Sequence, residues 1–226
     1  MQKTPLTAAV LAVALCGLGA ASAAPTPPKE DFAYDWTLRG FKGAVARLFV
    51  PGRGEGRLTT ESNGDSILVT ELRISAGGQR SDEFWAYGAE IDPERRQTLK
   101  AWSAQRFRGE SRRRERDGRG IGALDLASSI YFLRQELPES GREADIWSSG
   151  QVHPVSIRPT GRGAAVVNGV ETPTRSYRIK GVKRPGRPVW KGQMDLVLTA
   201  DEAALPLEIV VVRKGMRIRL ALVDPQ

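Results

Sequence analysis

Large apolar side chains alternate with polar or small ones along most of the chain, which is the pattern of half-buried β-strands. The first clear segment is 32–38, whose large residues would share one face: Phe32, Tyr34, Trp36 and Leu38. Glycine and proline punctuate the chain between such segments, so consecutive strands are expected to pair as hairpins. The pattern therefore predicts a mainly β protein.

The same period-two pattern recurs to the end of the chain. In the first half the predicted strands span residues 44–50, 57–62, 66–75, 82–89 and 97–108. In the second half they span residues 143–148, 151–158, 164–168, 175–182, 190–199, 207–213 and 216–223. Within 82–89, Trp85 and Tyr87 are expected on one face, with Phe84 and Ala86 on the other. Residues 159–163 contain one proline and two glycines and are interpreted as a turn.

Residues 125–137, DLASSIYFLRQEL, form the one strongly helical segment. Their apolar residues recur at spacings of four, three and four, which places one stripe along a helix: Leu126, Ile130, Leu133 and Leu137. Asp125 is a suitable N-cap because its carboxylate can accept backbone N–H groups of the first turn. Tyr131 and Phe132 leave few positions for water, so the helix is expected to be buried on more than one side.

These elements predict a single curved antiparallel sheet, or half-barrel, with one central helix packed in its concavity. The expected organisation is a signal peptide at 1–23, a flexible lead-in at 24–31 and a single β-rich domain at 32–226. Arg134 would be partly enclosed in this arrangement. It should then need a carboxylate or several carbonyl groups as partners.

The segment 1–23 has the features of a secretory signal peptide: Lys3, an apolar run and Ala21-Ser22-Ala23 before the expected cleavage point. The apolar run is shorter than the ~20 residues that a membrane-spanning helix needs, which argues against an anchor. Cys16 leaves a lipoprotein signal as an alternative, although Leu15 stands where such a signal has a small residue. We therefore expect a periplasmic protein with no transmembrane segment and no cysteine after cleavage.

The chain carries a formal net charge of +8, to which Lys3 in the predicted signal peptide contributes one. In the cell envelope, anionic partners for such a protein include lipid headgroups, lipopolysaccharide phosphates and acidic polysaccharides. An anionic or amphipathic envelope component is thus the expected partner. The alternative is that the positive charge only keeps the protein soluble. Nothing in the sequence indicates the oligomeric state.

The most charged segment, 106–119, holds seven arginines interleaved with Glu110, Glu115 and Asp117. Guanidinium groups suit nucleic-acid phosphates, but the predicted export, the interleaved acids and the lack of any nucleic-acid-binding motif argue against nucleic acid. Two interpretations stay open. One is a solvated hairpin with charged outer faces, and the other is contact with an anionic envelope ligand.

The chain resembles the bacterial domain of unknown function 3108 family, whose members are secreted or envelope proteins. The matching segments are FAYDWTLRGFKGAVA (32–46), AEIDPERRQTLKAW (89–102), DLASSIYFLR (125–134) and LTADEAALPLEIVV (198–211). The last segment, with Asp201 and Pro206, is also similar to one in the periplasmic lipoprotein-localisation proteins. In those proteins a half-open antiparallel barrel with helices in its concavity holds acyl chains, so the resemblance implies a curved sheet and an apolar cavity. Neither resemblance brings catalytic residues.

The residues favour a protein that is not an enzyme. The single histidine, His153, is followed by Pro154, and no GxSxG motif or other sign of nucleophile activation accompanies Ser128 or Ser129. We expect no catalytic residues, no cofactor and no metal site, since histidine and cysteine ligands are lacking and no EF-hand pattern occurs. Two carboxylates could still meet in a cleft as in a glycosidase, which leaves a hydrolase as an alternative.

The predicted function is non-covalent binding of a lipid or another amphipathic envelope component. Its candidate contact residues are Trp36, Trp85, Tyr131, Arg134 and Trp147. The aromatic residues would contact acyl chains and arginines an anionic head; otherwise the same aromatics fill a dry core. The alternative function is a protein-interaction or assembly module. A carrier needs an enclosed apolar volume of several hundred Å³, whereas an interaction module should be packed solid and carry a surface patch.

Overall fold

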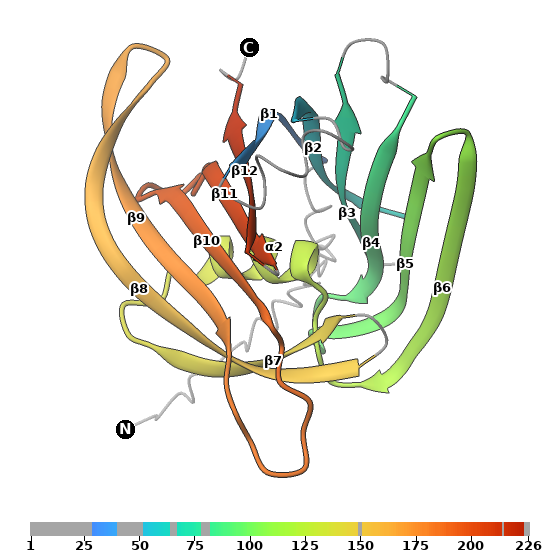
Figure 1. The fold of residues 1–226 in the computed structure, drawn as a ribbon. Helices are drawn as coiled ribbons and strands as arrows, with labels where there is room; N and C mark the ends of the chain where they lie inside the picture. The colour runs from blue at the N-terminus through green and yellow to red at the C-terminus, as the bar shows by residue number, and fades with distance from the viewer. Residues whose placement is uncertain are drawn as a thin grey trace, which may run out of the picture.

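One curved sheet of twelve antiparallel strands forms most of the described chain (Figure 1). The computed structural model describes residues 29–39, 52–63, 67–77, 82–148, 151–213 and 215–223. Within these ranges the sheet holds a single helix, α2, in its concavity, and it does not close into a barrel. The predicted fold class is therefore confirmed.

The strands of the first half are β1 (Glu30–Arg39), β2 (Arg53–Ser62), β3 (Leu68–Ala76), β4 (Phe84–Asp92), β5 (Gln97–Phe107) and β6 (Glu110–Ile121). Helix α2 (Leu126–Glu136) follows them. The strands of the second half are β7 (Arg142–Ser148), β8 (Gln151–Val167), β9 (Val170–Gly181), β10 (Gly192–Thr199), β11 (Pro206–Arg213) and β12 (Met216–Leu222).

The strand order is β6-β5-β4-β3-β2-β1-β12-β11-β10-β9-β8-β7. Each half is a meander, and the pairing of β1 with β12 joins the halves. The two edges, β6 and β7, are consecutive in the sequence, and α2 lies between them. The edges touch where Leu124 forms a bridge with Ile146 and accepts a hydrogen bond of 2.8 Å from the Trp147 N–H. The chain thus nearly closes the sheet and leaves α2 inside.

Helix α2 begins and ends where the sequence predicts. The Asp125 carboxylate accepts hydrogen bonds from the N–H groups of Ala127 and Ser128 at 2.6 and 3.0 Å. Leu137 ends the helix in the left-handed conformation, and its N–H bonds to the Leu133 carbonyl. Both caps satisfy groups that a helix end leaves open.

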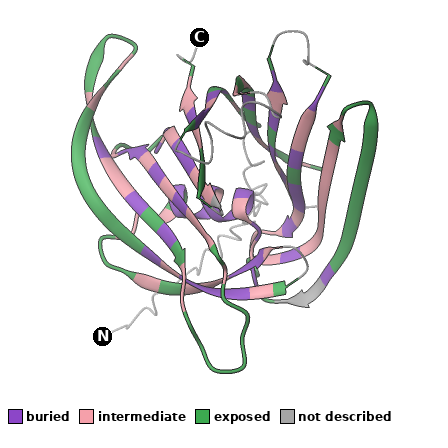
Figure 2. Cartoon of the chain, in the orientation of Figure 1, coloured by how far each residue is buried: buried purple, intermediate pink, exposed green. Residues whose placement is uncertain are grey.

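The main core lies between the concave side of the sheet and helix α2 (Figure 2). Alternate residues of β1 point inward, so Tyr34, Trp36 and Leu38 are buried while Asp35 and Arg39 are exposed. The main cluster joins these side chains with others from β2, β3, α2 and β7 to β12. A second cluster packs Phe132 of α2 against β3 and β4. Tertiary packing thereby stabilises a helix too short to persist alone.

Two expectations about strand bounds are wrong. β1 begins at Glu30, so the last residues of the expected lead-in belong to the sheet. Residues 159–163 are no turn: β8 runs continuously from Gln151 to Val167, with a register shift between Pro159 and Gly161. A proline is tolerated there because β7 pairs with β8 only as far as Ile157, which leaves that edge of β8 unpaired.

The predicted signal peptide, with Cys16, and the predicted strand 44–50 lie outside the described residues. No helix in the described ranges is long and apolar enough to cross a membrane.

Candidate functional site

The concave surface of β2 to β6 changes from apolar to basic across the sheet. Residues that face each other across antiparallel strands share one side of the sheet. One such row contains Leu58, Leu72, Tyr87, Ser103 and Arg114, one residue from each strand from β2 to β6. The row lies on the concave side, because Thr70, two residues from Leu72, places its hydroxyl 2.8 Å from the Ser128 hydroxyl of α2. At ~4.8 Å per strand, the wall from Leu72 to Arg114 is about 14 Å wide.

Two further rows on the concave side also end in an arginine of β6. From β2 to β6, one row contains Gly56, Ile74, Trp85, Gln105 and Arg112. The other contains Thr60, Thr70, Ala89, Ala101 and Arg116. The wall therefore has an apolar region on β2 and β3, aromatic rings on β4, small or polar residues on β5 and arginines on β6. We call residues Trp85, Tyr87, Ser103, Gln105, Arg112, Arg114 and Arg116 the graded wall.

The aromatic part of the graded wall is accessible to solvent. Tyr87 is 49% exposed although it lies on the concave side, and Trp85 is partly exposed beside Phe107, with ring centroids 6.1 Å apart. Trp85 and Tyr87 lie on the same face, as the alternation in the sequence predicts. They thus offer apolar surface on the same wall as the arginines, with β5 between the two sets, rather than filling the core.

The arginine-rich segment separates into two faces because successive residues of a strand point to opposite sides. Arg112, Arg114 and Arg116 point to the concave side, and all three are exposed. The opposite face carries charges that are paired with one another. There Arg113 and Lys100 form ion pairs with Glu115 at 2.7 and 3.0 Å.

The concave row of arginines carries excess positive charge. Arg112 forms an ion pair with Glu110 at 3.0 Å. Arg114 and Arg116 form no ion pair with any other described residue. Arg112 and Arg114 line a depression of about 170 Å³ together with Ser103 and Gln105. This volume lies below the range of about 300 to 1,000 Å³ that holds a whole drug-sized ligand, so it suits a small anionic group.

Trp36 and Trp147, two of the predicted contact residues, are core residues. Trp36 is 3% exposed, and its indole N–H donates a hydrogen bond of 2.7 Å to the Ser75 carbonyl. Trp147 is 5% exposed, near Gly118 at the point where the edges of the sheet meet. Neither presents a surface to a ligand, so the dry-core interpretation applies to both.

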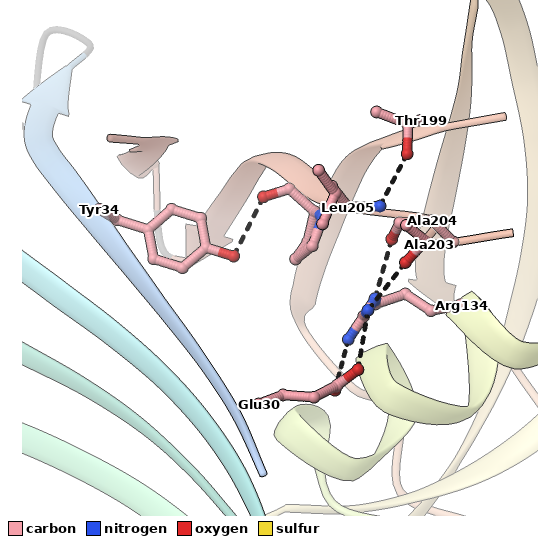
Figure 3. A network of polar contacts seen from close by, with 8 residues as sticks. Glu30, Tyr34, Arg134, Thr199, Ala203, Ala204 and Leu205 are labelled. Atoms are coloured by element: carbon pink, nitrogen blue, oxygen red, sulfur yellow. Dashed lines mark hydrogen bonds and ion pairs between the residues drawn. The ribbon is translucent and has the colours of Figure 1, made fainter. Parts of the chain in front are cut away.

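Arg134 anchors α2 to the sheet (Figure 3). Its guanidinium donates to both carboxylate oxygens of Glu30 at 2.7 and 3.0 Å, and to the carbonyls of Ala203 and Ala204 at 2.9 and 2.8 Å. The expectation that it needs a carboxylate or several carbonyls is thus confirmed, and it has both. These four bonds occupy the side chain, which is 5% exposed, so it is a structural residue.

Tyr131 lies at the border between core and surface. Its ring packs edge-on against Phe132, with centroids 5.2 Å apart, in the second cluster. Partial burial raises the pKa of its hydroxyl, and the nearby carboxylate of Glu30 adds to this shift. The five predicted residues therefore do not form one site: of them, Trp85 alone belongs to the graded wall.

The sequence contains a signal for the arginines of the graded wall. In the segment RRRERD (112–117), every second residue from Arg112 onward is arginine, while the residues between them are Arg113, Glu115 and Asp117. A period of two separates these sets only if the segment is a strand. The face that points into the concavity depends on the register across β3 to β6, which no single strand reveals.

Other parts of the described surface show less organised chemistry. A larger, open depression of about 550 Å³ is polar and of mixed charge, and Arg142 within it is paired with Glu136. Within the described ranges, no three His, Cys, Asp or Glu side chains gather as a metal site would require. His153 is buried, and its ring nitrogens contact the carbonyls of Pro188 and Ser148 at 3.1 and 3.3 Å.

No protein-family model and no curated protein matches the chain in sequence. The resemblance to the domain of unknown function 3108 family therefore stays a prediction. Among solved structures, the chain is similar to a beta-barrel-like protein of the domain of unknown function DUF1849 from Brucella abortus, with 11% identity and a TM-score of 0.52. That alignment covers 87% of this chain and 96% of the other. At this identity the similarity shows the fold alone.

A second structure is a putative outer membrane lipoprotein-sorting protein domain from Vibrio parahaemolyticus. It has 8% identity and a TM-score of 0.38, over 86% of this chain and 83% of the other. A TM-score this low does not establish a common fold. The shared architecture with the Brucella protein is thus what these comparisons establish.

Proposed function

We propose that this protein binds an anionic amphipathic component of the bacterial cell envelope, in the periplasm, without making or breaking bonds. The anionic group would lie at Arg112, Arg114 and Arg116, and the apolar part would extend along Trp85 and Tyr87 toward β3. The graded wall is complementary to such a ligand, because it carries apolar rings for the apolar part and cationic groups for the anionic group.

The observation that carries this proposal is the row Tyr87, Ser103 and Arg114 on the concave side, in which Tyr87 and Arg114 are exposed. The three arginines on one inward face repel one another, since like charges lie ~7 Å apart along the strand. An anionic ligand would remove that repulsion. The paired charges of Arg113 and Glu115 on the opposite face illustrate how the same strand balances its charges elsewhere.

The mode of binding that fits this geometry is surface binding along an open wall. The two depressions described above are both lined mainly by polar residues, so the proposal rests on an open wall and not on an enclosed apolar cavity. A ligand held in this way stays accessible to a membrane or another protein. We therefore favour sensing or presentation of the ligand over complete shielding.

The test is a fluorescence titration of the mature protein with lysophosphatidylglycerol, which is anionic, and lysophosphatidylcholine, which is zwitterionic, both below micelle formation. We expect tighter binding of the anionic lipid and weaker binding as salt rises. The double variant Arg114→Gln, Arg116→Gln should lose about tenfold in affinity for the anionic lipid.

The matched control is Arg113→Gln, one residue away on the opposite face of β6. It removes one positive charge from the same strand, against two in the double variant, and should leave the affinity unchanged within twofold. Equal losses in Arg113→Gln and in the double variant, or equal affinity of the protein for both lipids, would contradict the proposal.

A further inference from the structure

The hairpin of β8 and β9 extends beyond the sheet as a two-stranded arm (Figure 1, orange, upper left). β7 pairs with β8 only as far as Ile157, and β10 pairs with β9 only from Thr174 onward. Within the described residues, 165–167 and 170–172 therefore pair only with each other, across a turn at Asn168 and Gly169. We call residues 165–172 the arm.

The tip of the arm is exposed (Figure 2), and it carries valine side chains on both faces. Val166 and Val170 are 71% and 63% exposed, the two largest values among the exposed large hydrophobic residues of the described chain. Val167 pairs with Val170 in the rung next to the turn, and Val166 pairs with Glu171 in the second rung. Because successive residues alternate, Val166 faces the side opposite to Val167 and Val170.

Apolar groups on opposite faces of one ribbon restrict what can cover them. A protein groove of ordinary shape covers one face of a strand pair, whereas the interfacial layer of a bilayer surrounds an inserted tip on all sides. The two outermost rungs extend about 7 Å along the ribbon, which is close to the ~5 to 10 Å depth of interfacial insertion. The geometry of the tip thus suits a lipid surface.

The charges at the base of the arm fit an anionic surface. Arg162 and Arg175 face each other across the ribbon, and Arg158 and Arg178 form another such pair further from the tip. Glu139 pairs with Arg162 and Arg175, and Asp195 with Arg178, so part of this charge is balanced. The net charge of the chain, +8, adds a long-range attraction to anionic headgroups.

We infer that the arm docks the protein on the surface of an anionic lipid bilayer by shallow insertion of Val166, Val167 and Val170. This inference does not rest on the proposed function of the graded wall, which is formed by other strands. Glu171 limits the depth, since its carboxylate should stay at the level of the headgroups.

The experiment is co-sedimentation of the chain without its predicted signal peptide. One sample contains vesicles of phosphatidylethanolamine and phosphatidylglycerol, and the other contains vesicles of phosphatidylcholine alone. We expect binding to the anionic vesicles and at least about tenfold weaker binding of the double variant Val166→Asp, Val170→Asp. Val189→Asp is the matched control. It places one aspartate at another exposed valine, outside the arm, and should bind like the wild type.

A second variant tests the inference if the aspartates disturb the hairpin. Val166→Trp should strengthen vesicle binding, because tryptophan favours the membrane interface. Unchanged vesicle binding in the double aspartate variant, or an equal loss in Val189→Asp, would overturn the inference. Absence of vesicle binding by the wild type would also overturn it, and arm-dependent crosslinking would then show whether a protein or a second copy of the chain covers the arm instead. Lysolipid titration without vesicles separates the two proposals: the arm variants should titrate like the wild type.

Discussion

A few buried polar residues determine how α2 is held inside the sheet. Arg134 joins the helix to the start of β1 through Glu30 and to the segment before β11 through Ala203 and Ala204. Tyr34 adds a hydrogen bond of 3.0 Å from its hydroxyl to the Pro206 carbonyl, and burial raises its pKa far above the usual value (Figure 3). The polar network thus connects three elements that are distant in the sequence.

Loss of the Arg134 side chain should lower the free energy of unfolding substantially. Arg134→Ala leaves the Glu30 carboxylate and two carbonyls without their partner, which costs about 3 to 5 kcal/mol for a buried ion pair. Urea unfolding followed by circular dichroism measures this difference. Arg162→Ala is the comparison, because Arg162 forms an exposed ion pair with Glu139 and its loss should cost under about 1 kcal/mol. Similar losses in both variants would contradict the anchoring role.

The Asp125 cap should make stability depend on pH. Burial raises the pKa of the Asp125 carboxyl above its ordinary value of 3.8, and the hydrogen bonds from Ser128 and Ala127 oppose this shift only in part. The folded protein therefore holds this proton more tightly than the unfolded chain does. The resulting contribution to stability is present at low pH and is lost as pH rises through the raised pKa.

Asp125→Asn tests this, since asparagine keeps the N-cap but does not ionise. Relative to the wild type, the variant should gain stability in urea unfolding as the pH rises above the ordinary carboxyl pKa of 3.8. Asp125→Ala, which removes the cap, should lose about 1 to 2 kcal/mol. A difference between Asp125→Asn and the wild type that stays constant with pH would contradict the raised pKa.

At the scale of elements, β4 and β5 pack tightly on the convex side of the sheet. A Cβ at Gly88 would lie 2.4 Å from Cζ2 of Trp102 and 2.7 Å from the Thr70 carbonyl oxygen. The Trp102 ring itself is fixed, because its N–H donates to the Glu71 carboxylate at 3.1 Å and Arg113 lies over its face. The absence of a side chain at Gly88 is therefore a packing requirement.

Gly88→Ala should destabilise the protein by about 1 to 3 kcal/mol, as overpacking does. Gly122→Ala is the control, since a Cβ there meets nothing within 4 Å. Thermal unfolding of both variants measures the effect. Equal melting temperatures for the two variants would show that Trp102 can move aside.

The elements that the sequence predicts best are those with a complete local pattern. The apolar spacing and the Asp125 cap locate α2 correctly, and the alternation in 32–38 and 82–89 gives the correct faces of β1 and β4. The unbroken course of β8 was not predictable from local signals. Pro159 and Gly161 locally indicate a turn, because the sequence does not show that this edge of the strand has no partner.

The site was predicted less well than the fold. The sequence predicts Trp36 and Trp147 as ligand contacts because large aromatic side chains could contact acyl chains. Size alone, however, does not distinguish a core residue from a surface residue. The graded wall depends on the alignment of β3 to β6, and this register arises from pairing between strands rather than from any one segment.

At the scale of the molecule, the two meanders differ in how far their concave faces are buried. The half from β7 to β12 packs its inner face into the main core with α2, while β4 to β6 keep aromatic and basic side chains accessible on theirs. Contact between the edges at Leu124 and Ile146 holds these halves around the helix. The concave side is therefore buried on one half and partly exposed to solvent on the other.

The measurement that tests this account most directly is native mass spectrometry of the mature protein purified gently from a bacterial periplasm, with organic extraction of bound molecules. We predict an adduct of one anionic amphiphile, present in the wild type and in Arg113→Gln and depleted in the variant Arg114→Gln, Arg116→Gln. An apo mass that persists after incubation with extracted envelope lipids would contradict the account, as would an adduct that both arginine variants retain equally.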